Sequence, residues 1–179
     1  MGISFHETEL SGVFVIEPER FNDERGFFAR SLSNREFAAH GINPEFVEGN
    51  ISFNRNRFTV RGMHFQRAPY AQAKLVRCTA GAIYDVVIDL RPDSRTFGRW
   101  FGVELSAENR YALFVPEGFA HGFQTLNENS EVVYQVSSYY VAESCDGVRW
   151  NDPTFGIKWP GTEGITINDR DKNYSDFQP

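Results

Sequence analysis

Short apolar runs separated by turn residues dominate the pattern of hydrophobic and polar positions along the chain. These runs are residues 12–16, 74–78, 82–90, 99–105, 111–115, 121–126 and 131–137. Strands this short, spaced at intervals of roughly ten residues, are typical of a β-sandwich or a closed β-barrel. A parallel sheet would need helical crossovers, and the runs are not separated by helical patterns. The pattern therefore predicts an all-β barrel.

One short helix is predicted before the barrel strands. Ser33 and Glu36 have the spacing of a capping box, which is typical of a helix N-terminus. Apolar Phe37 and Ala38 follow, and Gly41 is a suitable C-terminal stop. We expect this helix to be peripheral.

Ionisable residues fall at inward-facing positions of some strands. Side chains alternate along a strand, so Val132, Tyr134 and Val136 share one face. By the same rule, Lys74 and Asp85 each share a face with apolar residues of their own strands. A charge inside a barrel is costly unless it is paired or used, which indicates a site in the lumen.

Composition narrows the class of protein. Of 179 residues, 41% are hydrophobic, which suits one domain over 1–179 with a barrel core at about 45–140. The net charge of −6 argues against nucleic-acid binding, which depends on a positive field. No run is apolar enough for a signal peptide or a membrane span, and Cys78 and Cys145 imply no disulfide framework. We expect a cytoplasmic protein that binds neither nucleic acid nor membrane.

Two of the four histidines have informative neighbours. His64 lies in the run Arg-Gly-Met-His-Phe-Gln, and His121 lies in Pro-Glu-Gly-Phe-Ala-His, which matches a turn of cupin barrels whose histidine is often a metal ligand. A metal cupin would carry His-x-His at the first run, and here Gln66 replaces the second of those histidines. Two histidines fall short of the three protein ligands that a catalytic metal usually has, although Asp85 would complete such a set. We therefore expect no metal. On spacing alone, His121 equally fits a packed, hydrogen-bonded barrel residue.

Taken together, these and further segments resemble the dTDP-4-dehydrorhamnose 3,5-epimerases. The matching segments are residues 21–28, 60–66, 73–78, 93–98, 105–109, 115–123 and 150–153. The resemblance implies a cupin-type jelly-roll barrel with short peripheral helices that forms a homodimer and needs no cofactor. It also implies the activity, which is epimerisation of dTDP-4-keto-6-deoxyglucose at C3 and C5 to dTDP-4-keto-L-rhamnose by proton exchange.

The resemblance assigns four catalytic residues. His64 is the general base, and Asp171 orients it, with Asp169 as the competitor because the match near the C-terminus is loose. Tyr134 is the general acid, and Lys74 stabilises the C4 oxygen of the sugar. These types suit the reaction, because a proton beside a ketone is acidic only when the anion spreads onto the carbonyl oxygen. Such a reaction needs a base, an acid on the other face and a positive group at that oxygen.

The same resemblance places the substrate-binding residues. Arginines suit the diphosphate because a guanidinium forms paired hydrogen bonds, and two aromatic rings are expected to stack on the base. The full set is Phe21, Arg25, Arg30, Glu48, Asn50, Arg61, Gln66, His121, Tyr140 and Arg170. Some of these contacts are expected to come from the partner subunit of the dimer.

Two departures from the family pattern fall among the nucleotide contacts. Ala29 and Arg30 stand where the family has glutamate after its phenylalanines, and Glu48-Gly49-Asn50 stands where the family has Gln-Asp-Asn. A carboxylate accepts from thymine N3–H, whereas an arginine only donates. Either Glu48 takes over the acceptor role and the substrate is a dTDP-sugar, which we favour, or the pocket prefers the acceptor atoms of cytosine in a CDP-sugar.

Other classes of function stay open at this point. A close alternative is an epimerase that inverts C3 alone. More distant alternatives are a metal-dependent cupin enzyme, which would purify with a bound metal, and a non-catalytic sugar-nucleotide binder, which would lack part of the base, orienter and acid set.

Overall fold

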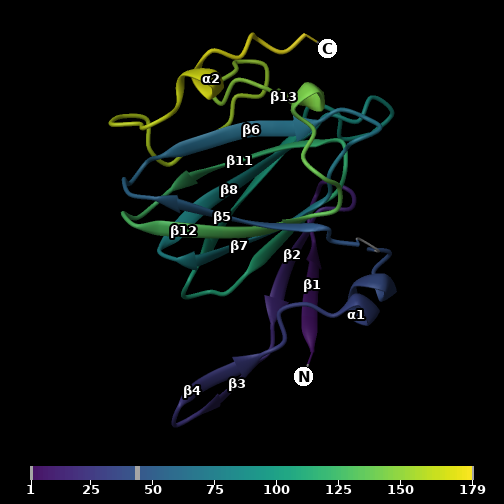
Figure 1. The fold of residues 1–179 in the computed structure, drawn as a ribbon, viewed down its shortest axis with the longest axis vertical. Helices are drawn as coiled ribbons and strands as arrows, with labels where there is room; N and C mark the ends of the chain where they lie inside the picture. Colours follow the sequence, from purple (N-terminus) through teal and green to yellow (C-terminus); the bar gives the residue numbers. More distant parts are fainter. Residues whose placement is uncertain (1, 43–44, 179) are drawn as a thin grey trace.

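The computed structural model describes residues 2–42 and 45–178, whose strands form two main sheets and a separate hairpin (Figure 1). The six-stranded sheet has the order β1 (Ile3–Glu7), β2 (Phe14–Pro18), β10 (Ala112–Val115), β7 (Lys74–Ala80), β12 (Ser130–Val136) and β5 (Glu48–Asn54). The five-stranded sheet has the order β13 (Cys145–Gly147), β6 (Val60–Gln66), β11 (Phe119–Thr125), β8 (Ala82–Asp89) and β9 (Trp100–Ser106). The hairpin consists of β3 (Arg20–Asp23) and β4 (Gly26–Ala29).

Neighbouring strands of the two sheets are antiparallel, and strands distant in sequence lie side by side. For example, β7 pairs with β10 and β12, and β11 pairs with β6 and β8. Two facing antiparallel sheets connected in this way make a jelly roll. The prediction of an all-β, cupin-type jelly-roll barrel is therefore confirmed.

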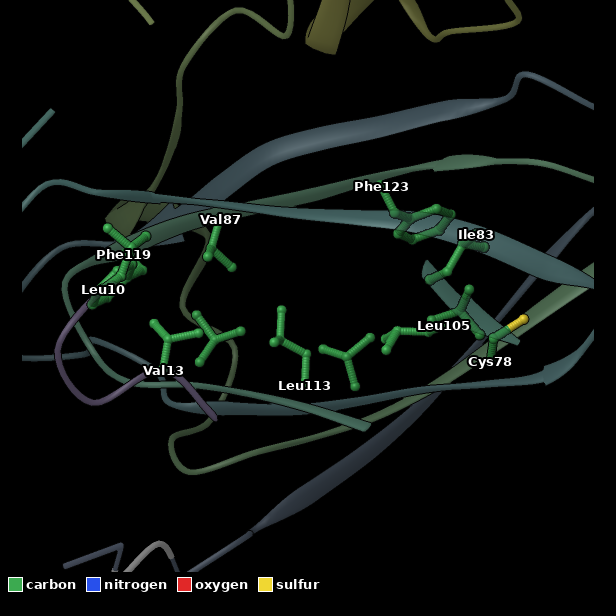
Figure 2. Close-up of a cluster of buried hydrophobic side chains, with 12 residues drawn as sticks. Leu10, Val13, Cys78, Ile83, Val87, Leu105, Leu113, Phe119 and Phe123 are labelled. Atoms are coloured by element: carbon green, nitrogen blue, oxygen red, sulfur yellow. The ribbon is translucent and has the colours of Figure 1, made fainter. Parts of the chain in front are cut away.

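An apolar core fills one part of the space between the sheets (Figure 2). It combines inward-facing side chains of both sheets, such as Ile83, Leu105 and Leu113, with Leu10 and Val13 from the segment before β2. Burying a side chain of this size stabilises the fold by about 1.5–3 kcal/mol. The predicted alternation holds, because Val132 lies in this core and Tyr134 packs against it.

Two peripheral segments cover the outer faces of the barrel. The predicted helix is present as α1 (Asn34–Ala39), and the Ser33 side chain accepts a hydrogen bond from Glu36 N–H as the capping pattern requires. Its Phe37 packs on the six-stranded sheet. Residues beyond β13 cover the five-stranded sheet through Val148, Phe155 and Trp159. This segment includes α2 (Asp169–Lys172), which lies over β6 in Figure 1.

The strand pattern missed several strands. The strands β1, β5, β6 and β13 and the β3–β4 hairpin were not predicted, because their apolar positions are interrupted by polar residues and glycine. In β5, for example, the polar residues Glu48, Asn50 and Ser52 alternate with Ile51 and Phe53. Among the described residues, the helices are too short to cross a membrane.

Candidate active site

Two adjoining cavities of about 220 and 290 Å³ open in the polar part of the barrel. Both are lined by His64, Lys74 and Tyr134, which therefore lie where the cavities meet. We name them the Tyr140 cavity and the Arg61 cavity after a residue that lines only one of them. All four side-chain types implied for proton exchange thus converge here, with Asp171 lying behind His64.

His64 and Asp171 form a tight pair although 107 residues separate them in sequence. His64 Nε2 lies 2.7 Å from Oδ1 of Asp171, and an ionised carboxylate only accepts hydrogen bonds, so Nε2 carries the hydrogen. Nδ1 is then the nitrogen with a free lone pair. The His64 side chain is 40% exposed toward the cavities, whereas that of Asp171 is 1% exposed. This is the arrangement of an accessible base with a buried orienting group.

Backbone geometry at Gly62 fixes the second oxygen of the same carboxylate. Gly62 N–H donates to Oδ2 of Asp171 at 3.0 Å. Gly62 has φ +119°, and a Cβ there would lie 2.6 Å from Gly122 Cα, so only glycine fits this approach of β6 to β11. Burial alone would raise the pKa of Asp171, but the hydrogen bonds from His64 and Gly62, with the nearby charges of His64 and Arg170, lower it below its usual value. Asp171 therefore stays ionised.

Asp169 is not the partner of His64. It is the first residue of α2 and is exposed, and the Asn168 side chain caps the helix by accepting from Asp171 N–H at 2.7 Å. The cap turns Asp171 toward the barrel. Of the two candidates from the sequence, Asp171 is the one that contacts His64.

A second histidine–carboxylate pair lies beside the first and is enclosed. His121 is directly opposite His64 in the β11–β6 pairing, and its Nε2 lies 2.8 Å from Oδ1 of Asp85. The side chains are 9% and 0% exposed. Burial lowers the pKa of His121, although Asp85 opposes this, so the imidazole is neutral near pH 7. His121 lines the Arg61 cavity, but it is less accessible than His64.

Lys74 brings a buried ammonium group to the cavities that His64 and Tyr134 also line. Its Nζ donates to the backbone oxygen of His64 at 3.3 Å, and the residue is 8% exposed. Burial lowers the pKa of Lys74 to about 8, and the charge of Asp85 limits the shift. The group therefore remains mostly positive near pH 7, where it can stabilise an oxyanion in the cavity.

Tyr134 approaches the same space from the opposite sheet. It lies on β12 of the six-stranded sheet, whereas His64 lies on β6 of the five-stranded sheet. Burial raises the pKa of Tyr134, and of its two charged neighbours Arg61 lowers it and Glu48 raises it. The phenol therefore holds its proton at neutral pH, as a general acid must.

Most residues predicted to bind substrate line these cavities. Glu48, Asn50, Gln66, Tyr140 and Arg170 line the Tyr140 cavity. Arg61 lines the other cavity with His121, and its Nε donates to Asn54 Oδ1 at 2.7 Å. Pattern analysis missed further lining residues, namely Phe65, Gln72, Cys145 and Asp146. Cys145 and Asp146 lie on β13, a strand of three residues that the hydropathy pattern does not indicate.

Three predicted binding residues lie away from the cavities of their own chain. Phe21 is on β3, Arg25 is in the turn of the hairpin, and Arg30 follows β4. The hairpin projects away from the barrel in Figure 1. Arg25 pairs with Asp23 at 2.6 Å, and Arg30 lies 3.8 Å from Glu36. The structure of one chain does not bring these residues to the site.

The described residues contain no group of three or more His, Cys, Asp or Glu arranged to hold a metal ion. His64 and His121 each direct Nε2 to a carboxylate of their own. The expectation of a metal-independent reaction stays a prediction, which elemental analysis of purified protein tests.

Comparisons of sequence and of structure with known proteins identify the same family. Residues 7–179 match the family model described as dTDP-4-dehydrorhamnose 3,5-epimerase. The dTDP-4-dehydrorhamnose 3,5-epimerase of Escherichia coli K12 is 45% identical over 166 residues, which cover 92% of this chain and 89% of that protein. The corresponding enzyme of Bacillus anthracis, solved with TDP and PPi bound, has a TM-score of 0.95 at 43% identity, covering 98% of this chain and 100% of that one. The Legionella pneumophila enzyme RmlC, solved with dTDP-4-keto-L-rhamnose, has a TM-score of 0.90 at 36% identity, covering 95% of this chain and 90% of that one.

Proposed function

The chain belongs to the dTDP-4-dehydrorhamnose 3,5-epimerase family, and from this premise we propose that it inverts C3 and C5 of dTDP-4-keto-6-deoxyglucose to give dTDP-4-keto-L-rhamnose. The observation that carries the proposal is the arrangement of groups on facing sheets. The His64–Asp171 pair lies on one wall of the cavities, Tyr134 lies on the other, and Lys74 lies beside both. Inversion of a carbon requires proton removal on one face and proton delivery on the other, which facing walls allow.

In this mechanism, Nδ1 of His64 removes a proton beside the ketone, and Asp171 stabilises the imidazolium that forms. Negative charge develops on the C4 oxygen, where the Lys74 ammonium group stabilises the enolate electrostatically. Tyr134 then delivers a proton to the opposite face of the same carbon. The raised pKa of the phenol and the burial of Lys74 both support these roles.

The direct test is incubation of the protein with dTDP-4-keto-6-deoxyglucose in D₂O, followed by NMR. We expect deuterium at both C3 and C5, with inversion at each. Deuterium at C3 alone would make the protein a C3 epimerase, the closest alternative. If no deuterium from the solvent enters either the dTDP-sugar or the CDP-sugar, the protein is not an epimerase of this kind.

The fall of kcat/KM at alkaline pH is expected to reflect deprotonation of Lys74. Its pKa of about 8 means that the ammonium group is lost as the pH rises through that value, so kcat/KM should fall there. Because the charge of Asp85 raises this pKa, Asp85→Asn should move the alkaline limb to lower pH. The measurement is kcat/KM from pH 6 to 10 for both proteins. An alkaline limb at the same pH in both would show that Lys74 does not control it.

The nucleotide is expected to extend from the reacting groups toward Tyr140. Arg61 and Arg170 supply guanidinium groups for the diphosphate, and the exposed ring of Tyr140 offers a stacking surface for the base. Glu48 lies beside Tyr140, since its Oε2 accepts from Tyr140 N–H at 3.3 Å. A carboxylate here would repel phosphate, which supports a place for Glu48 near the uncharged base.

We therefore expect dTDP to bind more tightly than CDP. Glu48 is an acceptor that pairs with thymine N3–H, whereas cytosine presents a lone pair at N3. One mismatched buried hydrogen bond costs about 1–3 kcal/mol, so calorimetry should find about a tenfold preference or more for dTDP. In Glu48→Gln, whose amide both donates and accepts, the preference should shrink. Tighter binding of CDP to the wild-type protein would favour the CDP-sugar alternative.

We also propose a homodimer in which the β3–β4 hairpin of one subunit completes the site of the other. The hairpin carries exposed aromatic side chains, including Phe21 and Phe28, and β5 presents exposed Ile51 and Phe53 at a sheet edge. Apolar groups of this size at an unpaired strand edge suit an interface between subunits. This arrangement would supply Phe21, Arg25 and Arg30 to a neighbouring cavity.

Mixing two inactive variants tests the shared site. Arg25→Ala removes a hairpin residue and Arg61→Ala removes a cavity residue, so each homodimer should be nearly inactive. A mixed dimer would contain one site with both arginines, and random mixing should restore about a quarter of the wild-type sites. The measurement is activity after co-refolding, with the dimer verified by light scattering. No recovery in verified mixed dimers would contradict the shared site.

We infer that the reaction takes place in the cytoplasm. The free thiols of Cys78 and Cys145 suit a reducing compartment.

A further inference from the structure

The side-chain amide of Gln66 is fully engaged by the protein. Its Nε2 donates to the backbone oxygens of Tyr70 at 2.7 Å and Tyr139 at 3.1 Å. Its Oε1 accepts from Val141 N–H at 2.7 Å and from the Cys145 thiol at 3.5 Å. An amide has two N–H donors and two lone pairs, and the side chain is buried at 5% exposure. Although Gln66 lines the Tyr140 cavity, no polar group of its side chain is left for a ligand.

The partners of Gln66 lie mostly on one segment, residues 137–145, which we name the rim segment. It leads from β12 into Cys145, the first residue of β13, and before that residue its regular structure is limited to the short 3₁₀ helix Ala142–Ser144. It carries Tyr140, which is 62% exposed at the edge of the cavity. Gln66 bonds to the residues on both sides of Tyr140, one through its carbonyl oxygen and the other through its N–H.

Two other side chains, Gln72 and Glu48, also bond to the rim segment near Tyr140. Gln72 Nε2 donates to the backbone oxygen of Ser138 at 2.7 Å, and Tyr140 N–H donates to Glu48 at a longer 3.3 Å. The bond to Glu48 is exposed to solvent, whereas those of Gln66 and Gln72 are partly buried. Gln72 contacts the rim segment only at Ser138, whereas Gln66 bonds to the residues on both sides of Tyr140. Losing the buried hydrogen bonds on both sides of Tyr140 costs more free energy than losing one exposed bond. Gln66 therefore has the larger influence on where Tyr140 lies.

We propose that Gln66 is a positioning residue that holds the rim segment so that the Tyr140 ring is in place before a nucleotide binds. The inference rests on the proposed function insofar as it concerns the nucleotide. A segment that is already ordered loses less conformational entropy on binding, so its ligand binds more tightly. Gln66 thus affects the affinity for the nucleotide through Tyr140 and takes no part in proton transfer at the sugar.

Hydrogen exchange on the ligand-free protein tests whether Gln66 holds the rim segment; we call this set of hydrogen bonds the tether. In Gln66→Met, which keeps the length and loses every polar contact, amides of residues 139–145 should exchange about tenfold faster or more, while those of β11 stay unchanged. Gln135→Met is the matched control, since the Gln135 side chain makes no hydrogen bond within the described part of the chain. Unchanged exchange in Gln66→Met would overturn the inference. Should that variant fail to fold, Gln66→Asn, which adds no charge and whose amide is one methylene too short to keep all of these contacts, gives the same comparison.

A double-mutant cycle with Tyr140→Ala tests the link to the nucleotide. Gln66→Met should weaken dTDP binding about tenfold and raise KM with a smaller change in kcat, and it should have less than a twofold effect when Tyr140 is already alanine. Equal effects in both backgrounds would overturn the role through Tyr140. A wild-type protein that binds no dTDP would contradict the proposed function and the nucleotide part of this inference, while the exchange result would still decide the tether.

Discussion

Replacement of His64 by alanine is expected to lower turnover by about 10²–10⁴-fold and to leave dTDP affinity almost unchanged. The imidazole supplies the free nitrogen at the junction of the two cavities, whereas the arginines and Tyr140 lie on other parts of the walls. Steady-state kinetics and calorimetry with dTDP measure the two quantities separately. A parallel loss of turnover and binding would indicate that His64 has a structural role instead.

Asp171→Asn tests how much the carboxylate contributes to the function of His64 as the base. Asparagine keeps the shape and can still accept from His64 Nε2–H, but its NH₂ group would then face Gly62 N–H, which is also a donor. It also removes the negative charge that stabilises the imidazolium. We therefore expect an intermediate loss, greater than tenfold and smaller than that of His64→Ala.

Tyr134→Phe is expected to separate proton removal from inversion. His64 remains able to take a proton and return it on the same face, so deuterium exchange beside the ketone should continue. Net epimerisation should fall by about 10²–10⁴-fold, because no acid remains on the six-stranded sheet to protonate the other face. NMR in D₂O distinguishes the two outcomes, since it measures label and configuration together.

The control for this variant is Tyr84→Phe, which removes a hydroxyl outside the barrel cavity. Tyr84 packs against Trp159 on the outer face of the five-stranded sheet. The Tyr84→Phe variant should retain full activity. If Tyr134→Phe loses exchange and inversion together, the phenol would be needed for proton removal, and the division of roles proposed between the two sheets would be wrong.

The strands predicted from the sequence are of two kinds. In some, apolar residues form a continuous run, and in the others apolar and polar residues alternate regularly. The runs at β7, β8 and β12 lie in the structure close to where hydrophobicity placed them. By contrast, β5 and β6 carry polar side chains inward because they form the wall of the cavity. A search for apolar runs thus overlooks two strands of the site, whereas it finds β7, β11 and β12, which carry Lys74, His121 and Tyr134.

Long-range pairing was beyond any local pattern. Nothing in the residues around Asp171 indicates that it meets His64, and the assignment came from resemblance to a family alone. The structure adds the physical reason, which is that the segment after β13 returns across the five-stranded sheet and places α2 above β6. Gln66 illustrates the opposite case. It was among the predicted substrate-binding residues, and only the structure shows that its amide bonds to the protein.

The four-residue length of α2 has a consequence for how the base can be lost. A helix of one turn has almost no stability of its own, so the docking of this tail onto β6 depends on a few contacts, such as the hydrogen bonds of Val60 N–H to Thr166 and of Gly62 N–H to Asp171. Undocking would leave the imidazole without its counterion while the barrel stays folded. The fraction of active protein then depends on the equilibrium between docked and undocked tail. Each loss of about 1.4 kcal/mol in the free energy of docking lowers the ratio of docked to undocked protein tenfold. Mild heat or a low concentration of denaturant should therefore abolish the activity before the barrel unfolds.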